Sequence, residues 1–279
     1  MKQIFFLLSL LLHSSLLMAQ TNSLPDIPTN NEDGFIVIAH RGASFYAPEN
    51  THSAFKLAIE MKAEMIELDV SLSKDGVPVV VHDETVDRTT NGKGLVSNYT
   101  LRELKNLETG SWFSDKYSGE PFPTLSEVLA YTKDKISVNI EIKTEAVTDE
   151  LKDGIIEKAL QIVEKAGVGD QVIFSSFDYR VMEHLEKLAP EMSKAILYEK
   201  SQSGDMKPSE LVTKYKVNAF NCSHRQLSDE WIEDLKTNNI PFFIYTVNDE
   251  KLMKTIIEKG ASGIFSDKPD LLKKVVENL

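Results

Sequence analysis

The sequence predicts an α/β fold, a (β/α)8 or TIM barrel with an insertion after its second strand. Short apolar runs rich in Val and Ile alternate with longer segments of helical period, and eight such pairs follow one another. The predicted domain at 35–279 has about 245 residues, a length that suits one barrel of this kind. A doubly wound open sheet would show the same alternation, but the number of pairs and the length favour the barrel.

The expected elements are placed by their apolar runs and their start signals. Strands are predicted at 35–39, 65–70, 136–142, 172–176, 194–198, 218–221, 241–247 and 263–266. Helices are predicted at about 51–63, 124–133, 149–166, 178–189, 208–215, 227–238, 248–260 and 269–278. Several helices begin at a recognised signal: Asn50-Thr51, Thr124 with Glu127 as a capping box, Pro208-Ser209, Ser228 and Asp249.

The N-terminus has the pattern of a secretory signal peptide. Residues 1–19 contain a lysine, an apolar run and then the small residue Ala19. The run is short for a membrane span, and no cysteine follows Ala19, which argues against a lipid anchor. An uncleaved N-terminal anchor is the alternative. We expect export to a periplasm or to the medium, without a stable membrane anchor, a polar linker at 20–34 and a single barrel domain at 35–279.

The composition limits the partners. The formal net charge is −12, so the overall field repels anions, and an anionic ligand must be attracted by local cationic side chains or a bound metal. Nucleic acid is therefore not an expected partner. Cys222 is the only cysteine, which rules out an intramolecular disulfide. The sequence gives no indication of the oligomeric state.

One connection is too long for a simple loop. Residues 84–123 should form an insertion at the barrel mouth, with a short helix near 100–107. Its aromatic residues could form a wall of a binding site or anchor the loop, and we favour the anchoring interpretation. They are Trp112, Phe113, Tyr117 and Phe122.

Charged residues stand where the predicted strands end, which is where barrel enzymes have their sites. His40 and Arg41 end the first strand, and Gly42 lets the chain turn away close to a ligand. In the second strand the spacing of Glu67 and Asp69 puts both carboxylates on one face.

Glu141 and Lys143 end the third strand in the same way. Three converging carboxylates, Glu67, Asp69 and Glu141, would repel one another, and a hard cation such as Ca²⁺ or Mg²⁺ would relieve this. The alternative is that Arg41 and Lys143 pair with these carboxylates and no metal binds.

A second histidine is brought back to this cluster by a hairpin. Asp75-Gly76 lies between two alternating runs, which predicts a two-residue turn. In that register residues whose numbers sum to 151 lie opposite one another, so His82 should face Asp69. Two imidazoles, a cation and two basic side chains suit a phosphodiester: one histidine accepts the proton of the nucleophile, and the other protonates the leaving alkoxide.

The segments that carry these residues resemble the glycerophosphodiester phosphodiesterase family, in its bacterial, exported type. The resemblance covers nearly all of the chain beyond the leader and rests on segments in family order: AHRGASFYAPENT, IELDVSLSKDGVPVVVHD, DRTTNGKG, GSWFS, FPTLSEVL, NIEIK, SSFD, YTVND and GIFSDKPD. It implies a (β/α)8 barrel with an insertion after the second strand. It also implies hydrolysis of a small glycerophosphodiester to sn-glycerol 3-phosphate and an alcohol.

The resemblance also implies roles for single residues. His40 would be the proton acceptor and His82 the proton donor. The divalent cation, Ca²⁺ or Mg²⁺, would be held by Glu67, Asp69 and Glu141. The implied substrate-binding set is His40, Arg41, Glu67, His82, Glu141, Lys143 and Tyr245.

Within that set, Arg41 and Lys143 would contact the phosphate or substrate. Tyr245 stands where the family often has tryptophan, so the apolar contact to the glycerol would differ. Glu49 and Asn50 are expected to shape the first loop and cap the first helix.

Two other functions stay open at this stage. A lysophospholipase D-type hydrolase would need an apolar groove leading from the mouth. A non-catalytic glycerophosphate-binding barrel would need no acid–base pair, and the presence of both His40 and His82 argues against it.

Overall fold

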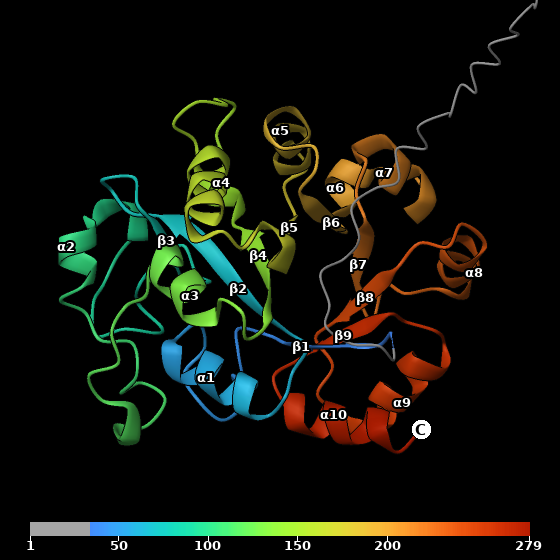
Figure 1. Cartoon of the computed structure of the whole chain (residues 1–279), viewed down its shortest axis with the longest axis horizontal. Helices are drawn as coiled ribbons and strands as arrows, with labels where there is room; N and C mark the ends of the chain where they lie inside the picture. Colours follow the sequence, from blue (N-terminus) through green and yellow to red (C-terminus); the bar gives the residue numbers. More distant parts are fainter. Residues whose placement is uncertain (1–33) are drawn as a thin grey trace, which may run out of the picture.

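The computed structural model describes residues 34–279, and in that range eight parallel strands close into a barrel (Figure 1). The predicted signal peptide at 1–19, and the linker as far as residue 33, lie outside the described residues. The barrel strands are β1 (Ile36–Ala39), β2 (Met65–Leu72), β4 (Ser137–Ile142), β5 (Val172–Ser176), β6 (Ser193–Leu197), β7 (Ala219–Ser223), β8 (Phe242–Tyr245) and β9 (Gly263–Ser266). Because β1 pairs with both β9 and β2, the sheet closes, and the open-sheet alternative is wrong.

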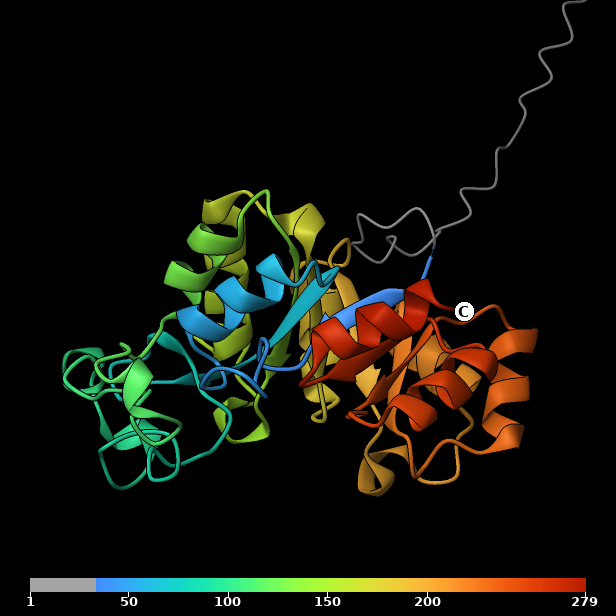
Figure 2. The same ribbon diagram turned by 90° about the horizontal axis from the view of Figure 1, so that it is seen from below.

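Helices surround the strands (Figures 1 and 2). Those that connect successive barrel strands or follow the last are α1 (His52–Glu60), α3 (Leu125–Thr132), α4 (Ile155–Ala166), α5 (Arg180–Leu188), α7 (Pro208–Tyr215), α8 (Asp229–Thr237), α9 (Glu250–Glu258) and α10 (Pro269–Glu277). Shorter pieces are α2 (Leu101–Leu104), α6 (Lys200–Ser203), and the 3₁₀ turns η1 (Val96–Asn98), η2 (Asp115–Tyr117), η3 (Thr144–Ala146) and η4 (Gly169–Gln171).

The start of α4 differs from the prediction. The expected helix at 149–166 begins only at Ile155, because Asp153 has a left-handed backbone with φ 59° and Gly154 is the extended N-cap. The caps predicted for α3, α8 and α9 are present. Thr124 and Glu127 form a capping box, and the side chains of Ser228 and Asp249 accept hydrogen bonds from the first turns of α8 and α9.

The barrel strands have two different faces. Residues such as Val37 and Leu68 point outward into the large core beneath the helices, whereas Ile38 and Met65 point into the barrel interior. Side chains alternate along a strand, so the inward row of β2 continues from Met65 to Glu67 and Asp69. The strand ends therefore place charged groups above the apolar cluster to which Ile38 and Met65 belong.

The hairpin after β2 has a different register from the one predicted. Strand β3 (Pro78–Val80) pairs antiparallel with β2, and the paired residue numbers sum to 150, as in Val70 opposite Val80. The turn has three residues rather than two, and its last residue, Gly76, takes φ 74°. The prediction that His82 lies opposite Asp69 is thus wrong by one residue, and the backbone carbonyl of Asp69 instead accepts the N–H of Val81 at 3.0 Å.

The insertion 84–123 packs on the hairpin through its own small core. Val79 and Val81 of the hairpin contact Phe122, Leu104 and other apolar residues of the insertion. The predicted short helix is limited to α2. In Figure 2 the insertion projects from one end of the molecule, on the side opposite the C-terminus.

The anchoring interpretation holds for two of the insertion's aromatic residues. Phe122 is buried, and the hydroxyl of Tyr117 donates to the carbonyl of Tyr46 in the first barrel loop at 2.9 Å.

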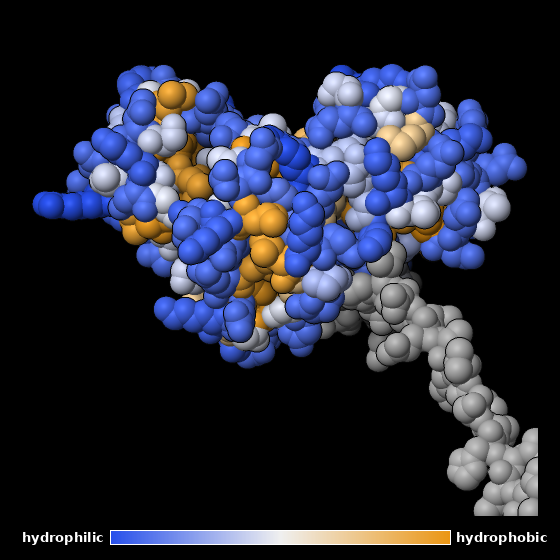
Figure 3. All heavy atoms as spheres, turned by 90° about the horizontal axis from the view of Figure 1, so that it is seen from above, coloured by the Kyte–Doolittle hydropathy of each residue, from blue (hydrophilic) through white to orange (hydrophobic). Residues whose placement is uncertain are grey.

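The outer surface is mainly polar. Figure 3 views the side along which α4, α5 and α7 lie in Figure 1, and hydrophobic residues show there between charged and polar ones. Within residues 34–279, no helix combines the length and apolar character that a membrane span requires.

Gly42 provides a test of how the first loop holds its shape. Its φ is 83°, and an added Cβ would lie 2.7 Å from backbone and side-chain carbons of Ala54. Gly119 has the same φ of 83°, but nothing lies within 4 Å of its added Cβ. We expect Gly42→Ala to lower the free energy of unfolding by at least about 2 kcal/mol and Gly119→Ala by about 1 kcal/mol, in chemical denaturation. Equal losses would show that the contact with Ala54 is unimportant.

Candidate active site

A cavity of about 220 Å³ opens at the carboxyl ends of the barrel strands. Charged residues and apolar residues both line it: His40, Arg41, Glu67, His82, Glu141, Ser175, Phe177, Leu197, Tyr245, Thr246 and Phe265. Six of these lining residues were predicted from the sequence as substrate-binding or catalytic. None of the four aromatic residues of the insertion is part of this lining.

The three predicted metal ligands come together. One oxygen each of Glu67, Asp69 and Glu141 lies within 4.8 Å of the others. Neighbouring strands explain this, since Asp69 on β2 is directly opposite Glu141 on β4 and Glu67 is two residues earlier on the same face. Glu67 is 3% exposed and Asp69 is 1% exposed, so the charges are held away from water.

Burial and mutual repulsion dominate the electrostatics of this trio. Burial, together with the charges of Asp69 and Glu141, raises the pKa of Glu67 well above its ordinary value. Burial and the charge of Asp69 also raise the pKa of Glu141. For Asp69, burial acts in the same direction, but Lys143 and Arg41 outweigh it and lower the pKa to about 2.

The two neighbouring cations do not neutralise all three carboxylates. The Lys143 ammonium lies 2.9 Å from Glu141 and 3.3 Å from Asp69, and Nε of Arg41 lies 3.5 Å from Asp69. Among residues 34–279 no ion pair reaches Glu67, which accepts only the backbone N–H of Arg41, at 2.8 Å.

The ion pairs of the metal-free alternative are thus present, yet they leave one carboxylate without a cation. An oxygen-only set with uncompensated negative charge fits a hard divalent cation.

The first loop holds its groups in left-handed backbone conformations. Arg41 has φ 57° and Asn50 has φ 58°, which is uncommon for residues other than glycine. The Asn50 side chain donates to the Asp69 carboxylate at 2.8 Å and accepts the Asp69 backbone N–H at 3.2 Å. Asn50 therefore fixes the Asp69 carboxylate. It does not cap the first helix as expected, because Thr51 is the N-cap of α1 and accepts from the N–H of Ala54.

Each histidine has its own carboxylate partner. Nδ1 of His40 lies 2.6 Å from Asp267, and Nδ1 of His82 lies 2.7 Å from Asp83. A carboxylate beside Nδ1 holds the proton there, so that Nε2 of the neutral ring is free to accept a proton. No role was predicted from the sequence for Asp83 or Asp267, although Asp267 directly follows β9 and Asp83 lies three residues after β3.

Arg88, which was also not predicted from the sequence, connects the partner of His82 with the first loop. It donates to Asp83 through Nε at 2.8 Å and to Glu49 at 2.7 Å, and Glu49 in turn accepts from Arg41 at 2.8 Å. The DRTT element after the hairpin is the signal that could have indicated it. Through these contacts Arg88, a residue of the insertion, links Asp83, the partner of His82, with Glu49 and Arg41.

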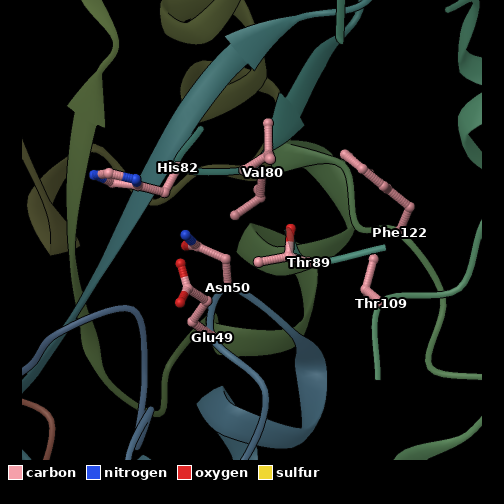
Figure 4. A pocket seen from close by; sticks show the side chains of 8 residues that line it. Glu49, Asn50, Val80, His82, Thr89, Thr109 and Phe122 are labelled. Atoms are coloured by element: carbon pink, nitrogen blue, oxygen red, sulfur yellow. The ribbon is translucent and has the colours of Figure 1, made fainter. Parts of the chain in front are cut away.

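The surroundings of His82 set the direction of its ring and lower its pKa. In Figure 4 its ring points away from Thr109 and Phe122 of the insertion, while Glu49 and Asn50 of the first loop lie beneath. Burial lowers the pKa of His82, and the positive charge of Arg41 adds to this, although Asp69 opposes it.

Comparison with known proteins gives one family. Residues 40–271 match the model of the glycerophosphoryl diester phosphodiesterase family. A glycerophosphodiester phosphodiesterase of Caldanaerobacter subterraneus is 41% identical over 242 residues, which cover 86% of this chain and 97% of the relative. One from Bacillus subtilis is 34% identical over 259 residues, which cover 87% of each chain.

Solved structures agree with this result. An Oleispira antarctica phosphodiesterase in complex with the product sn-glycerol-3-phosphate is similar with a TM-score of 0.79 and 30% identity, over 86% of this chain and 96% of that one. A glycerophosphodiester phosphodiesterase from Agrobacterium tumefaciens gives 0.75 and 30%, over 86% and 99%.

The raised pKa of Glu67 predicts that cation binding is linked to proton release. As the pH falls toward that raised pKa, Glu67 takes up a proton that must leave before a cation binds, so Ca²⁺ affinity should weaken with decreasing pH. Calorimetry in two buffers of different ionisation enthalpy would measure the released protons, and Glu67→Gln, which cannot release this proton, is the control. Affinity independent of pH, with no proton release, would contradict the account.

Proposed function

The chain belongs to the glycerophosphoryl diester phosphodiesterase family, and from this premise we propose a metal-dependent mechanism in which two histidines transfer protons. The protein is a glycerophosphodiester phosphodiesterase, a phosphoric diester hydrolase acting on a small-molecule substrate. The single observation that carries the mechanistic proposal is the arrangement of His40 and His82. Both line one cavity beside three carboxylates, and both have Nδ1 held by an aspartate.

Glu67, Asp69 and Glu141 are the proposed ligands of a divalent cation, Ca²⁺ or Mg²⁺. Both ions prefer oxygen ligands, which these three carboxylates would supply. Bound there, the cation supplies Lewis-acid polarisation of the phosphoryl group. Arg41 also lines the cavity, which supports a contact between its guanidinium group and a substrate oxygen.

The histidines divide the proton transfers. Nε2 of His40 accepts the proton of the nucleophile, which is water or a glycerol hydroxyl, and His82 protonates the leaving alkoxide. An alkoxide is a poor leaving group, so its protonation matters most for natural substrates. Because burial lowers the pKa of His82, its protonated form decreases as the pH rises through that lowered value, and donor activity should decrease with it.

The remaining lining residues are proposed to bind the glycerol side of the substrate. Tyr245 lies in the cavity with Phe177, Leu197 and Phe265, and these give the glycerol carbons an apolar surface. Lys143 completes the basic set near the phosphate. The family premise and the two supported imidazoles both favour catalysis over passive glycerophosphate binding.

We also propose that the protein is of the bacterial, exported type. The support is the pattern of residues 1–19, with a lysine, an apolar run and Ala19, before the polar stretch that leads to the barrel. Cleavage would release a protein that acts in a periplasm or outside the cell. N-terminal sequencing of the protein recovered from a bacterial host should begin after Ala19, and an intact N-terminus at Met1 would contradict export by this route.

The leaving group separates the two histidine roles. His40→Ala and His82→Ala should each lower kcat by about 10²-fold or more on glycerophosphocholine. On a glycerol phosphodiester with a nitrophenol leaving group, which needs little protonation, His82→Ala should regain much of its activity, whereas His40→Ala should not.

Circular dichroism and thermal melting would check that both variants keep the fold. If His82→Ala lost the same activity on the good and the poor leaving group, His82 would not be the proton donor.

A further inference from the structure

Three residues at adjacent strand ends form a hydrogen-bonded line that ends at His40. Asn248 follows β8, Asp267 follows β9 and His40 follows β1, and these three strands are neighbours in the barrel. Nδ2 of Asn248 donates to Oδ2 of Asp267 at 2.5 Å, and Oδ1 of Asp267 lies 2.6 Å from Nδ1 of His40.

The amide of Asn248 can face Asp267 in one orientation only. Its Oδ1 accepts the backbone N–H of Asp267 at 2.9 Å and the hydroxyl of Ser266 at 3.0 Å. A flipped amide would place its NH₂ against the backbone N–H donor and its oxygen against a carboxylate oxygen. Nδ2 is therefore fixed as the donor toward Asp267.

The partners of Asp267 leave its negative charge available to His40. Asn248 and Ser44 are neutral donors, and the Ser44 hydroxyl reaches Oδ1 at 3.0 Å. Burial would raise the pKa of Asp267, but the hydrogen bonds from His40, Asn248 and Ser44 outweigh it and keep the carboxylate ionised. By contrast, the aspartate behind His82 is paired with the cation Arg88.

We propose that Asn248 and Asp267 are positioning residues that fix the tautomer of His40, with the proton on Nδ1 and the lone pair of Nε2 toward the cavity. Because Nδ2 of Asn248 is a donor, the side-chain atom of residue 267 that faces it must be an acceptor. The other side-chain atom of residue 267 is then the one that faces Nδ1 of His40. The inference rests on the proposed role of His40 as proton acceptor, because only an unprotonated Nε2 can take the proton of the nucleophile.

The isosteric variant Asp267→Asn gives a specific expectation. Nδ2 of Asn248 still requires an acceptor, so the new amide must turn its oxygen toward Asn248 and its NH₂ toward Nδ1 of His40. Ser44 does not prevent this, since its hydroxyl hydrogen also reaches the carbonyl of His40, at 2.7 Å. Nδ1 then becomes an acceptor, the proton moves to Nε2, and the neutral ring can no longer act as a base toward the substrate.

The kinetic consequence differs from that of a merely structural defect. The corresponding change in a serine protease triad lowers kcat about 10⁴-fold through the wrong tautomer. We expect a loss in kcat of about 10³-fold or more for Asp267→Asn, with KM little changed. Asp267→Ala imposes no tautomer and should lose less, whereas a structural role predicts that the isosteric asparagine is the milder change.

The reciprocal swap is the matched control. In the double variant Asn248→Asp with Asp267→Asn, the new carboxylate at 248 accepts the amide of residue 267, whose oxygen again faces Nδ1 of His40. The composition and net charge are unchanged, and the kcat of the swap should exceed that of Asp267→Asn by at least about tenfold. Thermal melting of all variants would confirm that they fold.

The tautomer itself is measured by ¹⁵N–¹H correlation spectra of the histidine rings in metal-free protein, with His40→Gln to assign the signals. The expected result is Nδ1–H in the wild type and in the swap, and Nε2–H in Asp267→Asn. An unchanged tautomer in Asp267→Asn, or a swap no more active than that variant, would overturn the inference. An inverted tautomer with full activity would instead contradict the acceptor role of His40 in the proposed function.

Discussion

Repulsion among three carboxylates, two buried and one partly buried, is the constraint on which the rest of the site depends. Glu67, Asp69 and Glu141 share one end of the barrel interior, where little water screens their charges. Groups drawn from distant parts of the chain compensate for this. Lys143 and Arg41 approach Asp69, and the Asn50 side chain donates to it while Asn50 itself adopts an uncommon backbone conformation. The raised pKa of Glu67, which no ion pair compensates among the described residues, is the strongest structural argument for a cation.

The same arrangement organises the histidines around the trio. His82 is fixed through Asp83 and Arg88, and Arg88 continues to Glu49 and Arg41 beside the carboxylates. His40, which follows β1, is fixed by Asp267, which follows the neighbouring strand β9. The insertion contributes no residue to the lining of the cavity at the strand ends. Its contribution to the site is indirect, because it packs on the hairpin that leads to His82.

The sequence allowed the barrel and the central site residues to be predicted because both follow from local periodicity. Alternation along β2 was enough to put Glu67 and Asp69 on the same face, and the eight pairs of elements were enough for the closed sheet. The hairpin register was wrong because a three-residue turn with Gly76 in the left-handed region cannot be distinguished from a two-residue turn by the Asp-Gly signal alone. Asp267 was missed because its partner His40 is 227 positions away, and their contact depends on the closure of the barrel.

The central claim is that the carboxylate trio works as a divalent-cation site. Release of sn-glycerol 3-phosphate from glycerophosphocholine should therefore be measured before and after exhaustive chelation, with the metal content of each sample determined. Activity should disappear with the metal and return with Ca²⁺ or Mg²⁺, and the activity of Glu67→Gln should not be restored in this way at the same cation concentration. Full activity in protein shown to be free of metal would contradict this claim.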